Sequence, residues 1–415
     1  MAEAGDPSSV NPWRALWFRP GLAVEAVLAR DRRITTLALA ALGSVFGLLA
    51  DASRSFHLFA AGPSQTAWLI VLVIALAGAL GGVVGLYIAG WIVAAVARAV
   101  GGRGSAAGAR AAYAWGSVPL LIPLFLTSAL GLVPTRYAAA PWLIVPLAAV
   151  LSIGLLWAIV VAIAMLARVQ GFGVARAVFS GVVGWFGVPF AFAFVVRTLA
   201  FQAFDAASGS MAPTLQSGDY VLVSKWAYGY SRYSLPFAPA WFEGRLFAGQ
   251  PRRGDVVVFV HPQDGADWVK RIVGLPGETI QMKGGRLFIN GEVVERRRIK
   301  PGFAIANSWG KTIEAPTYDE MLPGGATHRI IQIDGDHGHF DDTAPFATPP
   351  DAYFVMGDNR DNSIDSRVPR ELGGFGFVPF ANIVGRAGII YYSIDANWPA
   401  GPATPRFERI GLAAE

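Results

Sequence analysis

The pattern of apolar residues divides the chain near residue 200. Before that point, long apolar stretches alternate with short segments that carry arginine. A helix needs roughly 20 apolar residues to cross a bilayer, because no water inside the bilayer can pair with an open backbone. The pattern predicts five such helices, at about residues 34–50, 67–97, 113–133, 142–167 and 177–196. Glycines crowd the middle of the second stretch, at Gly78, Gly81, Gly82 and Gly85, and predict a helix that is strongly tilted or broken there.

After residue 196 the pattern changes to short runs of Val, Ile, Phe and Tyr, separated by Gly, Pro, Asn and Asp. This pattern is typical of strands and turns, and the clearest strands are predicted at 219–224, 255–260, 329–333, 353–356 and 383–393. Asn290 and Gly291 separate two further short runs, and this dipeptide accepts positive φ at both central positions of a turn. It predicts a β-hairpin within a mostly β domain.

Composition and charge support the same division. Residues 1–200 contain no lysine, 13 arginines and five acidic residues, whereas residues 201–415 hold the other 21 basic and 24 acidic residues. The excess positive charge therefore lies between apolar segments and not on a soluble face, which argues against nucleic acid as a partner. Cysteine is absent, which excludes disulfides and thiolate catalysis.

The arginines also predict orientation, because short cytoplasmic loops retain positive charge during membrane insertion. The intervening loops carry only Arg54 and Arg136. The N-terminal segment and the second and fourth loops carry many more: Arg14, Arg19, Arg30, Arg32, Arg33, Arg98, Arg103, Arg110, Arg168 and Arg176. We expect a cytoplasmic N-terminus, five crossings and an extracytoplasmic second half, with no cleavable signal peptide ahead of the first helix.

Three segments of the second half resemble the ordered sequence boxes of bacterial type I signal peptidases, the S26 serine proteases. They are SGSMAPTL at 208–215, RGDVVVF at 253–259 continuing to VKRIVGLPG at 269–277, and GDNRDNSIDSR at 357–367. The resemblance extends from about residue 196 to residue 386, but residues 206–207 and the additional residues 368–373 depart from the family pattern. The first 200 residues, with NPWRALWFRP at 11–20, resemble the Yip1 family of five-helix membrane domains.

The first resemblance implies a role for each of four residues. Ser210 matches the nucleophile and Lys270 the general base, while the Ser210 backbone N–H and the Ser208 hydroxyl match the donors to the oxyanion. Ser363 matches the serine that hydrogen-bonds the lysine and orients it. Peptide cleavage needs these three functions: a nucleophile, a base and oxyanion donors.

A lysine can act as a base only when it is neutral, and an ordinary lysine pKa of about 10.4 makes that rare at neutral pH. We therefore expect Lys270 to be buried among apolar side chains such as Val269, Ile272 and Val273, without a carboxylate partner. The charged residues of the boxes are expected to support the site as buried pairs, Arg271 with Asp358 among them. This supporting group comprises Asp358, Arg360, Asp365, Arg367 and Arg271.

Other patterns leave alternatives open. A Ser-His-Asp triad would use His261, His328, His337 or His339, and HGHFDD at 337–342 offers oxygen and nitrogen donors to a metal. Neither matches a recognised motif, so we predict no metal and no cofactor. The basic run 296–300 is typical of a solvated strand edge or loop, with contact to anionic headgroups as the alternative. Six apolar residues near the start of the second half form either a face that contacts lipid or ordinary core, and the resemblance to signal peptidases favours lipid: Phe201, Phe204, Met211, Trp226, Trp241 and Phe242.

These observations predict an α-helical membrane bundle followed by a mostly β catalytic domain of antiparallel sheets. The expected parts are a multi-spanning Yip1-like domain (1–176), a last transmembrane helix (177–196) and a signal peptidase domain (197–415). The expected function is removal of signal peptides from exported preproteins at the outer face of the bacterial inner membrane. Expected partners are preproteins with small residues before the cleavage site, membrane lipids and the secretion machinery. A non-catalytic membrane scaffold is the alternative, which loss of Ser210, Lys270 or Ser363 would indicate, and a self-cleaving regulator is a more remote one.

Overall fold

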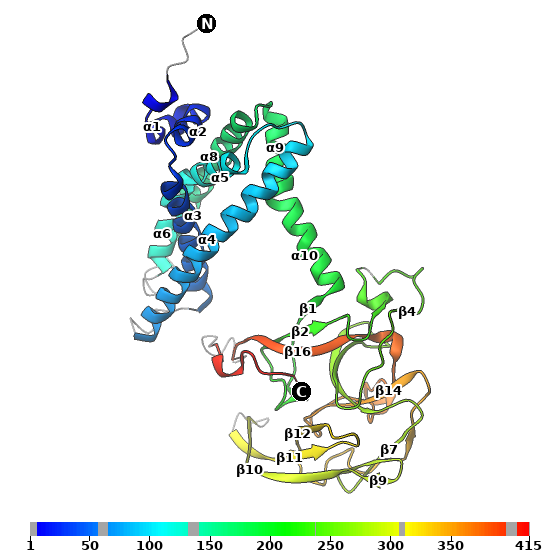
Figure 1. Cartoon of the computed structure of the whole chain (residues 1–415). Coiled ribbons are helices and arrows are strands. Elements are labelled where there is room, and N and C mark those ends of the chain that lie inside the picture. The colour runs from blue at the N-terminus through cyan, green and yellow to red at the C-terminus, as the bar shows by residue number, and fades with distance from the viewer. Residues whose placement is uncertain are drawn as a thin grey trace. The chain divides into compact units, whose positions relative to one another are not determined.

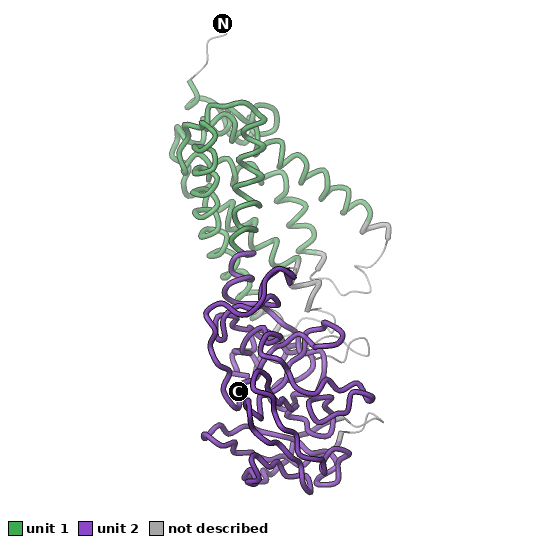
Figure 2. The backbone as a smooth tube through the Cα atoms, turned by 90° about the vertical axis from the view of Figure 1, so that its right-hand side faces the viewer, with its two compact units in different colours: residues 1–192 green, residues 193–415 purple. Residues whose placement is uncertain are grey.

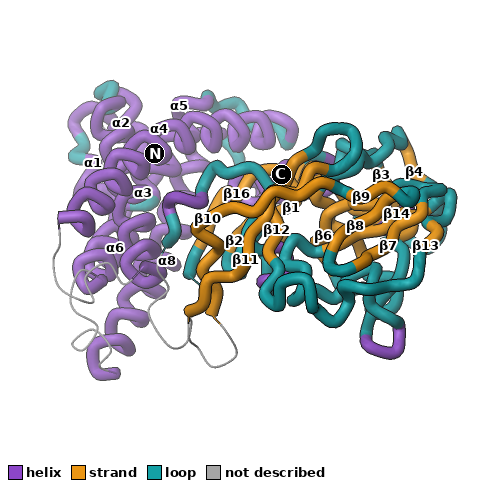
Figure 3. The backbone as a smooth tube through the Cα atoms, turned by 90° about the horizontal axis from the view of Figure 1, so that it is seen from below, coloured by secondary structure: helices purple, strands orange, loops and turns teal. Residues whose placement is uncertain are grey.

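The computed structural model describes residues 6–56, 65–131, 141–236, 238–306, 312–395 and 405–414. The chain forms two compact units, residues 1–192 and 193–415 (Figure 2). The described part of the first unit is helical, and strands gather in the second (Figure 3). The predicted division of the chain into a helical and a mostly β part is therefore confirmed.

The first unit is built from helices that pack mainly on their neighbours in sequence (Figure 1). In chain order the described helices are α1 (Pro12–Phe18), α2 (Pro20–Ala29), α3 (Arg33–Phe56), α4 (Gln65–Ala99), α5 (Ala106–Gly116), α6 (Val118–Gly131), α8 (Pro141–Gln170), α9 (Val174–Val182) and α10 (Val188–Leu199). Among the described residues, four helical segments are long and apolar enough to cross a membrane, and a fifth span results if the bent pair α5 and α6 is counted as one.

Helix α4 is continuous over 35 residues, so of the two expected outcomes the break at its glycines is wrong, and the tilt stays a prediction. The glycines instead allow close packing: a Cβ on Gly82 would lie 2.5 Å from the Ala40 carbonyl oxygen of α3, and one on Gly78 would lie 3.0 Å from the Val45 backbone. Small residues let helix backbones approach each other in membranes, where burial of apolar surface gives little driving force.

Two other predicted spans differ in their details. The third begins earlier than expected, at Ala106, and bends by 48° between α5 and α6. The fifth begins at Val174 and continues through a π-helical turn, Val183–Gly187, to Leu199. The predicted boundary between residues 176 and 177 thus falls inside α9.

The second unit contains a seven-stranded antiparallel sheet, which positions the candidate site. Its strands lie in the order β1 (Phe201–Asp205), β2 (Asp219–Ser224), β16 (Ile383–Ser393), β5 (Val256–Val260), β6 (Asp267–Gly274), β14 (Ala352–Met356) and β15 (Val378–Pro379). Apolar residues of β2, β5 and β16 form a core cluster together with Met211 and Leu215 from the segment between β1 and β2. That segment is therefore anchored on the sheet.

Smaller antiparallel sheets complete the unit. The first has four strands, in the order β13 (Phe346–Ala347), β7 (Thr279–Lys283), β8 (Arg286–Ile289) and β9 (Glu292–Val293). The second has three strands, β10 (Glu295–Ala306), β11 (Thr312–Met321) and β12 (Thr327–Ile331). The third pairs β3 (Tyr230–Ser231) with β4 (Arg245–Leu246). Asn290 and Gly291 form the predicted hairpin turn between β8 and β9, with φ of 52° and 87°. The long hairpin β10–β11 was not predicted, and it contains the basic run 296–300.

Candidate active site

Ser210 lies in a short 3₁₀ turn, Gly209–Met211, between β1 and β2. The turn is held from both sides. Met211 belongs to the core cluster beneath the sheet, and the backbone N–H of Asn359 donates to the Ser210 carbonyl at 3.1 Å. The Asn359 side chain also donates to the Gly209 carbonyl at 3.1 Å. The sequence motif 208–215 therefore places a serine hydroxyl at a rigid position beside the loop that follows β14.

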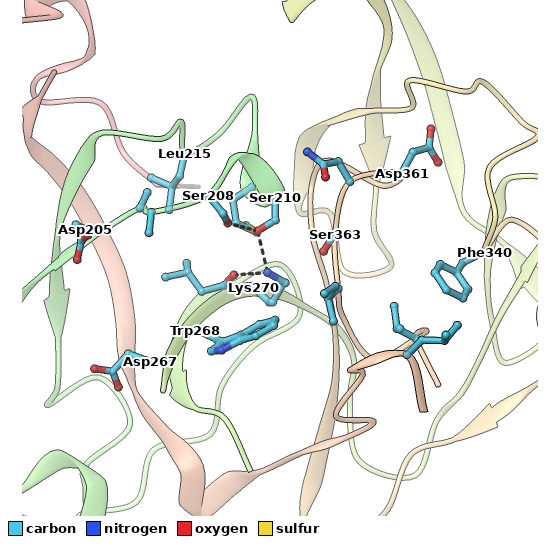
Figure 4. A pocket seen from close by; sticks show the side chains of 18 of the residues that line it. Asp205, Ser208, Ser210, Leu215, Asp267, Trp268, Lys270, Phe340, Asp361 and Ser363 are labelled. Atoms are coloured by element: carbon cyan, nitrogen blue, oxygen red, sulfur yellow. Dashed lines mark hydrogen bonds between the residues drawn. The ribbon is translucent and has the colours of Figure 1, made fainter. Parts of the chain in front are cut away.

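Lys270 lies on β6, which pairs with β5 on one side and β14 on the other. Its ammonium nitrogen is 2.9 Å from Ser210 Oγ and 3.1 Å from the Val269 carbonyl oxygen (Figure 4). The nitrogen also lies 5.2 Å from the centre of the Trp268 ring. Two residues about sixty positions apart in the chain are thus brought into hydrogen-bond contact.

Burial lowers the pKa of Lys270 to about 8. Asp365 and Asp358 act in the opposite direction and Arg367 acts in the same direction, but desolvation of the amine is the largest influence. The side chain is 3% exposed, and among the described residues no carboxylate forms an ion pair with it. This environment agrees with the expectation of a buried lysine, although Ile272 and Val273 belong to core clusters on other parts of the sheet.

The other two predicted serines line the same cavity as Ser210 and Lys270. The Ser208 hydroxyl lies 3.1 Å from Ser210 Oγ, close enough to reach an oxygen that develops negative charge there. Ser363 does not form the hydrogen bond to Lys270 that the resemblance implies. Its Oγ is buried and finds no hydrogen-bond partner in the described part of the chain. Ser363 is carried on the loop after β14 and lines the cavity without this bond.

The predicted pair of Arg271 and Asp358 is formed beneath the site. Arg271 Nε donates to Asp358 Oδ1 at 2.8 Å, and Nη2 donates to Oδ2 at 2.7 Å. Thr214 donates to the same carboxylate at 2.6 Å, which ties it to the segment that carries the nucleophile. Burial alone would raise the pKa of Asp358, but the Arg271 charge and these hydrogen bonds lower it below its usual value.

Three more charged residues of the loop, Arg360, Asp365 and Arg367, take part in two further buried pairs. Arg367 contacts Asp365 at 2.9 Å, and Asp365 accepts the Gly357 backbone N–H at 3.0 Å. Arg360 pairs with Glu320 on β11 through both of its terminal nitrogens. Glu320 was not predicted, because no local pattern marks a residue forty positions away as the partner of Arg360. These bonds fix the shape of the loop and are consistent with a supporting role.

Gly357 is required by the close approach of this loop to the nucleophile. A Cβ at this position would lie 2.2 Å from Ser363 Oγ and 2.5 Å from the Ser210 carbonyl oxygen. No side chain can be accommodated at these distances without displacing the loop or the turn that carries Ser210. The glycine that opens the third sequence box thus has a steric explanation.

The cavity that Ser210 and Lys270 line has a volume of about 680 Å³, and its wall is mainly apolar. Several of its lining residues had no predicted place beside the Ser210–Lys270 pair: Trp268, His339, Phe340, Asp361, Ile364, Val368 and Leu372. Trp268 could have been found, because it lies two residues before Lys270 on one strand and so points to the same face. Val368 and Leu372 belong to the additional residues 368–373, which therefore shape the cavity wall.

The alternative arrangements find less support. The hydrogen-bond partners of Ser210 Oγ in the described chain are Lys270 and Ser208, not a histidine. His328 is buried beside Glu320 and Asp358, and burial lowers its pKa to about 4. No group of three or more residues that could hold a metal is found among the described residues, those of the 337–342 segment included. Among the apolar residues predicted to contact lipid, Met211 is buried in the core, whereas the side chains of Phe201, Trp226 and Trp241 are exposed.

A buried lysine beside a serine, carried on an antiparallel β domain that follows apolar helices, defines a serine peptidase attached to a membrane. Comparisons with known proteins agree. Residues 180–392 match the family described as "Signal peptidase, peptidase S26", and residues 14–197 match the Yip1 domain. The chain belongs to the signal peptidase family S26 and is a multi-spanning integral membrane protein.

Within that family, the curated proteins similar to this chain include signal peptidase I enzymes. The signal peptidase I of Rickettsia typhi is 38% identical over 214 residues, which cover 50% of this chain and 77% of that protein. The signal peptidase I of Rickettsia conorii is 36% identical over 223 residues, 52% and 80% of the two chains. A crystal structure of a signal peptidase I from Enterococcus faecalis is 25% identical and covers 33% of this chain and 97% of that chain, with a TM-score of 0.19.

Proposed function

We propose that Ser210 and Lys270 form a catalytic dyad that removes signal peptides from preproteins at the outer face of the membrane. The observation that carries the proposal is the 2.9 Å contact between Ser210 Oγ and a Lys270 amine that is buried and has a lowered pKa. A neutral amine at this distance can accept the hydroxyl proton, as a general base must.

The proposed reaction uses the described groups in sequence. The neutral Lys270 amine takes the proton of Ser210 as its oxygen attacks the scissile carbonyl. The Ser210 backbone N–H and the Ser208 hydroxyl donate to the resulting oxyanion. The Lys270 ammonium then gives its proton to the leaving amine, and the peptide bond breaks to leave an ester on Ser210. Water, deprotonated by the same amine, attacks the ester carbonyl. The ester bond then breaks, the Lys270 ammonium returns its proton to Ser210 Oγ, and the acyl part leaves as a carboxylate group.

We also propose the arrangement in which this reaction occurs. A membrane domain (1–176) and a last transmembrane helix (177–196) hold a catalytic domain (197–415) that lies outside the membrane. The distribution of arginines supports this orientation, and five spans are compatible with the bent pair α5–α6 counted as one. The exposed side chains of Phe201, Trp226 and Trp241 support contact of the catalytic domain with lipid.

Substrates are expected to be preproteins with small residues before the cleavage site. The apolar wall of the cavity, with Met211, Leu215 and Val269, suits short apolar side chains, and Leu372 belongs to the segment in which this chain departs from the family pattern. This part of the wall is where preferences particular to this chain are expected.

The test is cleavage of a model preprotein by the full chain purified in detergent. Ser210→Ala and Lys270→Ala should each lower the rate by at least about a hundredfold, because each removes a group that reacts. Lys283→Ala is a matched control, since it removes an exposed lysine of β7 that lies outside the cavity. All variants should unfold at similar temperatures. Near-normal cleavage by either cavity variant would show that the dyad is wrong, and a wild-type chain that binds preprotein without cleaving it would favour the scaffold alternative.

A further inference from the structure

The membrane unit contains a second cavity, which the peptidase reaction does not use. It has a volume of about 330 Å³ and lies within the first unit, among the turn between α2 and α3, the second half of α4 and the first half of α5. Its polar lining residues are Asp31, Arg32, Arg33, Thr36, Tyr87 and Arg110. A phosphate group is much smaller than this volume.

The positive charge in this cavity is only partly neutralised. Asp31 pairs with Arg33 at 2.8 Å, and both of these side chains are mostly exposed. No ion pair forms at Arg32 or Arg110 within the described residues, so the cavity retains a net charge of +2. Unpaired like charges that face one cavity repel each other, and a bound anion removes that repulsion.

Arg32 has an unmet donor, and Arg110 is oriented by an aromatic ring. Arg32 Nε is buried and has no hydrogen-bond acceptor in the described part of the chain, although an unmet buried donor is costly. The Arg110 guanidinium lies 4.5 Å from the centre of the Tyr87 ring. Stacking on the ring orients the guanidinium, and guanidinium groups match the oxygen geometry of phosphate. Donors that lack a partner and are already oriented are what an anion site requires.

The level of the cavity along the helices points to the source of the anion. Helix α3 and its apolar span both begin at Arg33, so its positive N-terminal end faces the cavity at the edge of the apolar stretch. On α4, Tyr87 lies within the apolar span Val71–Ala99, so the level of the cavity follows from the start of the α3 span. The cavity therefore lies at the depth of lipid headgroups.

We propose that this cavity binds a phosphate group through Arg32 and Arg110. Free phosphate and a phospholipid headgroup carry the same chemistry, and the depth of the cavity favours an anionic phospholipid such as phosphatidylglycerol. Asp31 is the one acidic residue in the lining, and its pairing with Arg33 keeps it from cancelling the other two charges. The site is independent of the peptidase reaction.

The test measures binding to the full chain in a zwitterionic detergent. Native mass spectrometry would record bound phosphatidylglycerol and bound phosphatidylcholine, and inorganic phosphate would be added as a competitor. Replacing both arginines, by Arg32→Gln with Arg110→Gln, should weaken phosphatidylglycerol binding roughly tenfold or more, because two charged hydrogen-bonding groups are lost. Arg103→Gln, at an exposed arginine outside the cavity, should leave binding unchanged.

The outcomes separate the two sources. Arginine-dependent binding of phosphatidylglycerol supports a lipid site, whereas arginine-dependent binding of inorganic phosphate without lipid binding supports a site for the free ion. Unchanged binding of both ligands in the double variant overturns the proposal, and so does an equal loss in Arg103→Gln. The unfolding temperature without lipid shows whether the double variant folds. If it does not, Arg110→Gln and Arg110→Lys are compared, and the proposal requires the lysine variant to bind more tightly.

Discussion

The proposed chemistry depends on the protonation of one side chain, Lys270. Asp358 and Asp365 are close enough to favour its charged form, yet each carboxylate is already paired with an arginine. Desolvation therefore dominates, and the pKa falls to about 8 instead of rising. The buried arginine pairs thus have a second consequence besides holding the loop: they weaken the carboxylates' influence on the amine.

This environment predicts the pH dependence of cleavage. The pKa of Lys270 is about 8, so at lower pH the amine is mostly protonated and cannot act as a base. We therefore expect kcat/KM to rise with pH and to level off above about pH 8. At pH 7 only about one tenth of the enzyme would hold the neutral form. Lys270→Arg should be inactive across the whole range, because a guanidinium does not lose its proton in proteins. Rates for a signal-peptide substrate between pH 6 and 10 provide the measurement, and a flat profile down to pH 6 would contradict the proposed base.

At the scale of elements, the segment 405–414 supports the nucleophile from a distance in sequence. Arg409 Nη2 donates to Asp219 Oδ2 at 2.5 Å and to the Thr214 carbonyl at 3.0 Å, and Asp219 is fully buried. Ala414 belongs to the same core cluster as Met211 and Leu215. The segment after Ser210 is therefore held between the sheet and the end of the described chain.

Removal of this contact should destabilise the catalytic domain. Arg409→Ala leaves the buried Asp219 carboxylate with Arg406 as its remaining ion-pair partner, at 3.2 Å, so we expect a loss of about 2 kcal/mol, as for a hydrogen bond to a charged group. Arg386→Ala is a suitable control, because Arg386 is half exposed and lies 3.8 Å from its carboxylate, Asp255. Thermal or urea unfolding of the purified variants would compare them. Equal stability of the two would show that Arg409 does not support the domain.

For the whole molecule, the central expectation is that the two ends of the membrane unit face opposite sides of the bilayer. The chain has no cysteine, so single cysteines introduce unique labelling sites. Ser9→Cys and Arg103→Cys should react with a membrane-impermeant thiol reagent only after cells are permeabilised. Glu292→Cys, on the exposed hairpin after β8, should react in intact cells. Labelling of all three cysteines from the same side would require an even number of membrane crossings. It would contradict the proposal that the catalytic domain lies at the outer face of the membrane.

Patterns local in sequence determined much of this protein. Apolar length predicted the membrane helices, and short apolar runs between turn residues predicted most strands of the large sheet. Three motifs singled out Ser210 and Lys270 as the candidate pair. Such features can be read from sequence because each depends on neighbouring residues: helix length on consecutive apolar side chains, a hairpin on two turn residues, a motif on fixed spacing.

The tertiary structure decided what depends on contacts between distant segments. The glycines of α4 pack against α3 instead of breaking the helix, and Glu320 pairs with Arg360. Arg409 pairs with Asp219, which lies 190 residues earlier in the chain. The burial that lowers the pKa of Lys270 and the missing bond from Ser363 belong to the same class. Desolvation and pairing energies are set by atoms that only folding brings within a few ångströms, so no pattern along the chain contains them.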